Sequence, residues 1–123
     1  MSKHVLIVDD DPAIAELLKL NFEAAGFNAD IAGEGQAALR MMDVTGYDLI
    51  VTDIFMPQFD GLEFLRMLRK RKSNEKIIAM SGGGANLGPS SFLELARLLG
   101  AAKTFEKPFD CRKLLAAAKL LLA

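Results

Sequence analysis

The sequence alternates five short apolar runs with longer segments in which apolar residues recur at helical spacing. The expected strands are residues 4–8, 28–32, 49–52, 76–80 and 104–106. Strands that alternate with helices pair in parallel, because each return to the sheet needs a crossover connection. The pattern predicts an α/β fold, with five parallel strands covered by helices on both faces.

The segments between the strands carry helix start and stop signals. Asp11 fits a helix cap, Pro12 fits the first helical position, and Gly26 ends the segment. This helix is expected to bury the apolar stripe Ile14, Leu17, Leu18 and Phe22. Four further helices are expected over residues 35–42, 61–72, 91–99 and 110–122.

Size and composition favour one soluble domain over residues 1–123. The net charge of −1 gives no support for a nucleic-acid partner. Cys111 is the single cysteine, so no internal disulfide is possible. The apolar C-terminus is too short to span a membrane. We expect a cytoplasmic protein without a membrane or nucleic-acid partner.

Polar side chains gather where the predicted strands end. Asp9 and Asp10 follow the first strand, Asp53 the third, Ser81 the fourth and Lys107 the fifth. Ligand chemistry in an open parallel sheet lies outside the carboxyl ends of its strands. The convergence of three carboxylates, a hydroxyl and an ammonium on one edge therefore predicts a functional site.

This set of residues suits phosphoryl chemistry. Clustered carboxylates favour Mg²⁺, which takes hard oxygen ligands and accepts phosphate oxygens. Lys107 offers a positive charge and Ser81 a hydrogen-bond donor to a phosphoryl group. A carboxylate nucleophile can form an aspartyl-phosphate, and positioning and charge stabilisation carry most of such a transfer.

Four stretches, VLIVDDDP, DLIVTDIFMPQFDGLEFL, IIAMSG and FEKPF, closely resemble the receiver domain of two-component response regulators. The resemblance covers essentially the whole chain. It implies a flavodoxin-like, doubly wound sheet of order 2-1-3-4-5 with five flanking helices. It also implies a signalling switch rather than an enzyme, acting on an unknown downstream protein.

The resemblance implies a role for each residue of the edge. Asp53 would accept the phosphoryl group from a histidine kinase or a histidine phosphotransfer protein. Asp10, Asp53 and the backbone carbonyl of Phe55 would bind Mg²⁺ directly, with Asp9 acting through water. Ser81 and Lys107 would contact the phosphoryl group, and the peptide bond after Lys107 would be cis.

Three features depart from the family pattern. Thr104 stands where the family has a switch aromatic, and the loop after Ser81 is longer than usual. We therefore expect the phosphorylation response in that loop. Phe55, two positions after the acceptor, is bulky and apolar, which predicts slow self-dephosphorylation.

Two alternatives belong to other functional classes. An aspartate-nucleophile phosphatase of the haloacid-dehalogenase type would use a D-x-D motif, but Pro12-Ala13 and the absence of a late acidic pair disfavour it. The complete set of strand-end residues argues against an adaptor that is never phosphorylated, but Thr104 and the altered loop after Ser81 keep this alternative open. The last helix, apolar nearly all round, could pack on the sheet, form a homodimer contact or continue into an output segment.

Some neighbouring residues are better explained by structure than by chemistry. Asp11 and Asp60 are interpreted as helix caps, and His4, which opens a strand, as a residue with a fold role.

Overall fold

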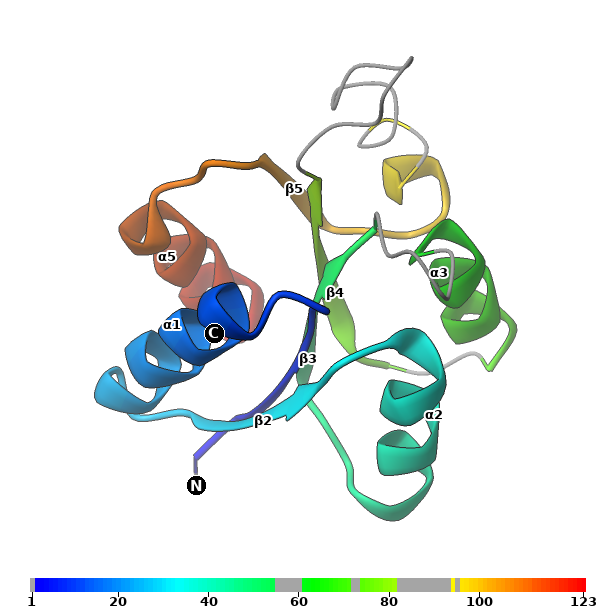
Figure 1. Cartoon of the computed structure of the whole chain (residues 1–123), viewed down its shortest axis with the longest axis horizontal. Coiled ribbons are helices and arrows are strands. Elements are labelled where there is room, and N and C mark those ends of the chain that lie inside the picture. Colours follow the sequence, from blue (N-terminus) through cyan, green and yellow to red (C-terminus); the bar gives the residue numbers. More distant parts are fainter. Residues whose placement is uncertain (1, 55–60, 72–73, 82–93, 95) are drawn as a thin grey trace.

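The computed structural model describes residues 2–54, 61–71, 74–81, 94 and 96–123. Its centre is a five-stranded sheet of order β2-β1-β3-β4-β5 (Figure 1). The strands are β1 His4–Val8, β2 Asn28–Ala32, β3 Leu49–Asp53, β4 Lys76–Ser81 and β5 Lys103–Glu106. Every neighbouring pair is parallel. The predicted α/β fold and strand order are confirmed.

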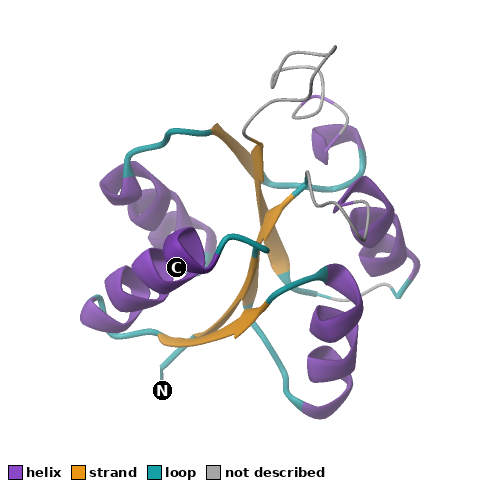
Figure 2. Cartoon of the chain, viewed as in Figure 1, coloured by secondary structure: helices purple, strands orange, loops and turns teal. Residues whose placement is uncertain are grey.

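Helices cover both faces of this sheet (Figure 2). Those with described bounds are α1 Pro12–Ala24, α2 Gly35–Val44, α3 Gly61–Lys70 and α5 Cys111–Leu121. Residues 94 and 96–98 are also helical, within the segment expected to hold the fourth helix. Helices α1 and α5 lie on one face, and α2 and α3 on the other (Figure 1). No helix in the described ranges is long and apolar enough to cross a membrane.

The central strands are buried on both faces, which explains their nearly continuous apolar sequence. Alternate side chains of β1 enter two core clusters. Leu6 packs in the cluster that contains Phe64 of α3. Ile7 packs in the cluster that contains Phe22 of α1. Because all neighbouring strands are parallel, their carboxyl ends lie at one edge of the sheet.

Both ends of α1 follow the sequence signals. The Asp11 side chain accepts a hydrogen bond from the Ala13 amide at 3.0 Å, and Pro12 is the first helical residue. Gly26, two residues past α1, has φ = 95°, a conformation that favours glycine. The predicted cap and stop are confirmed, and the cap leaves Asp11 turned to its own helix.

Some details of the prediction are wrong. Strand β3 includes Asp53 and β4 includes Ser81, so each runs one residue further than expected. Leu17 is half exposed, at 50%, whereas Ala15 is buried. Helix α1 therefore faces the core through the 15–18–22 row rather than through Leu17, because the sheet and α5 both pack on that side.

Candidate functional site

The strand register brings the predicted residues to one edge of the sheet. Asp53, the last residue of β3, pairs with Met80 of β4. Ser81, the next residue of β4, pairs with Glu106 of β5, directly before Lys107. The Lys107 amide donates to the Ser81 carbonyl at 2.8 Å. Main-chain hydrogen bonding between the strands therefore fixes the backbone positions of Asp53, Ser81 and Lys107.

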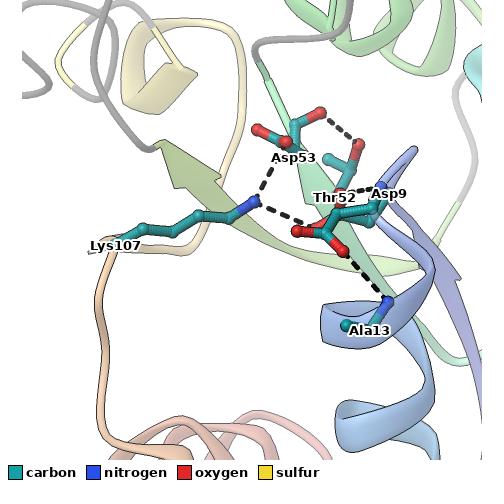
Figure 3. A network of polar contacts seen from close by, with 6 residues as sticks. Asp9, Ala13, Thr52, Asp53 and Lys107 are labelled. Carbon is teal, nitrogen blue, oxygen red and sulfur yellow. Dashed lines mark hydrogen bonds and ion pairs between the residues drawn. The ribbon is translucent and has the colours of Figure 1, made fainter.

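Lys107 bridges two of the predicted acids (Figure 3). Its ammonium donates to Asp9 Oδ2 at 3.0 Å and to Asp53 Oδ2 at 3.1 Å. The side chains are 16%, 0% and 7% exposed for Lys107, Asp9 and Asp53. Burial lowers the effective dielectric, so charges here interact more strongly than on the surface. One cation thus faces two carboxylates that would otherwise repel each other.

Asp9 is held through both carboxylate oxygens. Oδ2 accepts from Lys107, and Oδ1 accepts from the Asp11 amide at 2.9 Å. The Asp9 amide donates to the Ala32 carbonyl of β2 at 3.1 Å. The three consecutive acids consequently differ: Asp9 is buried and fixed, Asp10 is exposed, and Asp11 caps α1.

The main chain at Asp53 is supported by a residue that the sequence analysis missed. The Thr52 hydroxyl donates to the Asp53 carbonyl at 2.9 Å, and both residues are buried. The available signal was a hydroxyl residue inside an otherwise apolar strand, where a buried polar group needs a partner. Thr52 is therefore a positioning residue for Asp53.

The burial of Asp9 has an electrostatic consequence. Burial raises the pKa of the Asp9 carboxyl, the nearby Asp53 charge raises it further, and the hydrogen bonds from Asp11 and Lys107 oppose the rise. For Lys107, burial lowers the pKa, but the Asp53 and Asp9 carboxylates outweigh it and the net pKa is raised. Lys107 stays charged, and Asp9 ionises at a cost that a further cation would reduce.

The acidic residues fit a divalent cation. Carboxylate oxygens of Asp9, Asp10 and Asp53 all lie within 4.8 Å of one another. Hard oxygen donors in such a cluster are the ligands of Mg²⁺ or Ca²⁺. Phe55, whose carbonyl is the fourth predicted ligand, lies outside the described residues, as do Asp60 and the loop of residues 82–91.

Two other sequence expectations are met. The Lys107-Pro108 peptide bond is cis. His4 has a structural environment: its Nε2 lies 2.9 Å from Asp30 Oδ2, which also accepts from the Tyr47 hydroxyl at 2.8 Å. This cluster includes the first residue of β1, at the end of the strand remote from Asp9.

Comparison with known proteins identifies the family and several relatives of this chain. The family described as response regulator receiver domain matches residues 5–119. The alkaline phosphatase synthesis transcriptional regulatory protein PhoP of Bacillus subtilis is 34% identical over 122 residues, which cover 99% of this chain and 49% of that protein. The chain spans about half the length of the curated relatives it matches.

Solved structures agree with the fold. A Francisella response regulator 1452 receiver domain has a TM-score of 0.87 at 30% identity, covering 98% of this chain and 97% of that one. A CheY-like receiver domain from Methanospirillum hungatei JF-1 has a TM-score of 0.88 at 29% identity, covering 99% and 94%.

Proposed function

Because the chain belongs to the response regulator receiver domain family, we propose that Asp53 is the residue on which it accepts a phosphoryl group. A receiver domain is a phospho-accepting switch and is not classed as an enzyme. Membership implies a histidine kinase partner, and we include a histidine phosphotransfer protein as an equivalent donor. The observation that carries the proposal is the Lys107 bridge between Asp9 and Asp53.

In the proposed transfer, a carboxylate oxygen of Asp53 attacks the phosphorus of a phosphohistidine. The new O–P bond forms as the P–N bond breaks, and the imidazole nitrogen leaves with the electron pair. Lys107 would move from Asp53 to a phosphoryl oxygen, and the 3.1 Å distance between its Nζ and Asp53 Oδ2 supports this role. Ser81, at the adjacent strand end, would donate from its hydroxyl to another phosphoryl oxygen.

We propose Mg²⁺ as the cofactor, bound directly by Asp10, Asp53 and the Phe55 carbonyl and through water by Asp9; the cluster of Asp9, Asp10 and Asp53 oxygens supports this proposal. Bound there, Mg²⁺ supplies positive charge to the phosphoryl oxygens and lets an anionic group approach an anionic nucleophile. The protein contributes the fixed geometry: Asp9 is oriented by the Asp11 amide, and the Asp53 main chain by the Thr52 hydroxyl.

A mass measurement tests the acceptor. The protein is incubated with Mg²⁺ and acetyl phosphate, and the intact mass is recorded for the parent, Asp53→Asn and Asp43→Asn. Asp43 is a matched control, because it is an exposed acid that pairs with Arg71 away from the site. A phosphate adduct is expected on the parent and Asp43→Asn, and none on Asp53→Asn.

Other outcomes select the alternatives. No adduct on the parent with any phosphodonor would favour a receiver-fold adaptor. Turnover of many phosphoesters would favour an aspartate-nucleophile phosphatase. An adduct that persists on Asp53→Asn would place the acceptor elsewhere.

We further propose that the protein acts in the cytoplasm, where a histidine kinase draws on ATP. Phosphorylation would bias the loop after β4, the fourth helix and β5 between two arrangements and so change a surface that a downstream protein binds. The matched relatives are transcriptional regulatory proteins of about twice this length, so any output activity belongs to this proposal.

A further inference from the structure

A pocket of about 340 Å³ lies at the end of the sheet opposite to the acidic site. It is formed where α3 ends, β4 begins and residues 98–100 pass. Its lining residues are Leu68, Arg69, Glu75, Ile77, Leu98, Leu99 and Gly100. This volume falls in the range of small-molecule sites, which combine an apolar wall with a few polar groups.

The two charged residues of the wall are not paired with each other. Arg69 donates through Nη1 to the Leu98 carbonyl at 3.0 Å. Neither Arg69 nor Glu75 forms an ion pair with any residue in the described ranges. Arg71, two residues further along, does find an acid, Asp43, at 3.0 Å.

Glu75 carries an acceptor that no described residue uses. Its Oε1 is the one buried side-chain nitrogen or oxygen in the described residues that lacks a hydrogen-bond partner. A buried carboxylate oxygen without a donor is unfavourable, and such atoms are rare in folded proteins. The terminal torsion of a glutamate is soft, so its carboxylate can be re-aimed into the pocket at little cost.

From this arrangement we propose that the pocket binds a small zwitterion with an apolar body, such as a branched-chain α-amino acid. The ligand carboxylate would lie against Arg69, whose planar guanidinium suits bidentate contact. The ligand ammonium would donate to Glu75, and the aliphatic part would cover Leu68, Ile77 and Leu99. The proposal goes beyond phosphoryl transfer and does not depend on it.

The test uses the full chain without phosphodonor or metal. Binding of L-leucine is followed by nuclear magnetic resonance through the amides of Ile77, Leu99 and Gly100. Each of two probes keeps the aliphatic part of leucine and only one of its charged groups. Isopentylamine has the ammonium alone, and 4-methylpentanoate has the carboxylate alone. Saturable shifts are expected with L-leucine in the millimolar range, with each half-probe weaker by about tenfold, the factor for one lost charged hydrogen bond.

Variants of Arg69 and Glu75 test whether each residue contacts the ligand. Glu75→Gln and Arg69→Gln should each weaken L-leucine binding by about tenfold. Arg71→Gln, which removes the same charge from the same helix end, should leave it unchanged. The proposal is overturned by the absence of saturable shifts with L-leucine, by half-probes that bind as well as L-leucine, or by parent-like binding in both Glu75→Gln and Arg69→Gln.

Discussion

The Lys107 ammonium lies 3.0 Å from Asp9 Oδ2, although 98 residues separate the two in sequence. This contact joins the segment after β5 to the residue after β1, at opposite sides of the central strand β3. Within the described part of the chain, Lys107 is the side-chain cation that forms an ion pair with the buried Asp9 carboxylate. A divalent cation at Asp9 and a phosphoryl group at Asp53 would both compete for the contacts that Lys107 now makes.

Replacing Lys107 should expose the repulsion between the acids. In Lys107→Ala, Asp9 and Asp53 each lose a charged partner while remaining buried, so the metal-free free energy of unfolding should fall by roughly 1–3 kcal/mol. Urea unfolding without Mg²⁺ measures this change. Lys103→Ala is the control, because it removes the same charge from an exposed position on β5. Equal losses in both variants would contradict a specific role for the bridge.

Removing the charge of Asp9 should raise the stability of the metal-free protein, whereas removing Lys107 should lower it. Its folded-state pKa lies above 3.8, so the folded protein binds this proton more tightly than the unfolded chain does. Its contribution to stability is therefore lost as pH rises through the folded-state pKa. Asp9→Asn keeps an oxygen for Lys107 and carries no charge, so the metal-free variant should be more stable than the parent at neutral pH. Thermal unfolding across a pH series checks this expectation.

The same variants test the metal. Mg²⁺ that binds only the folded protein should stabilise the parent, by about 2.7 kcal/mol at 100 times its Kd. Asp9→Asn and Asp10→Asn should lose most of that gain, because each removes a negative charge from the oxygen cluster. Melting temperatures with and without Mg²⁺ give the comparison. If Mg²⁺ does not raise the melting temperature of the parent, the assignment of Asp9 and Asp10 to a metal site is wrong.

The residues that could be predicted are those whose position follows from topology. Asp9, Asp53 and Lys107 come at strand ends, and parallel strands bring their carboxyl ends to one edge whatever their exact length. Their proximity could therefore be predicted without knowing how the side chains pack. What the sequence could not supply is which oxygen meets which nitrogen, because that depends on register and burial.

The residues that the sequence analysis misplaced or missed also depend on burial and packing. Leu17 and Ala15 are both compatible with a helical stripe, and only the packing of α1 against the sheet and α5 chooses between them. Thr52 is one polar residue in an apolar run, and its hydroxyl acquires a role only once its own strand is buried. Asp30 was not singled out from the sequence, and its contacts with His4 and Tyr47 exist only because the fold brings the three residues together.

Among the glycines that the structure describes, Gly61 should be the least tolerant of a side chain. A methyl group there would collide with the main chain of Ile54, the residue after Asp53. Because main chain cannot move aside as a side chain does, Gly61→Ala should lower the free energy of unfolding by about 1–3 kcal/mol, as overpacking does. It should also displace Asp53 and reduce the acetyl phosphate adduct.

Gly46→Ala is the control for this substitution. A methyl group at Gly46 meets nothing within 4 Å. Urea unfolding of the two variants should therefore separate them, with Gly46→Ala close to the parent. A Gly61→Ala protein as stable as Gly46→Ala would show that the contact between Gly61 and Ile54 relaxes freely.

Tyr47 allows a direct measurement of one pKa. Burial, with a hydrogen bond to Asp30 and its negative charge, raises the pKa of the Tyr47 phenol from 10.0 to about 12. The folded protein therefore holds this proton more tightly than the unfolded chain, and the stability from Tyr47 is complete below pH 10 and lost as pH rises towards 12. The chain has one tyrosine and no tryptophan, so tyrosinate absorbance reports Tyr47 alone.

In the folded parent, the absorbance midpoint should lie well above that of the protein unfolded in urea. Asp30→Asn should lower the midpoint without restoring it fully, because burial remains when the charge is gone. Asp43→Asn, which removes an exposed acid elsewhere, should leave it in place. Circular dichroism at each pH establishes that the chain is still folded. A folded parent that titrates near pH 10 would mean that in solution the Tyr47 hydroxyl is neither buried nor in contact with Asp30.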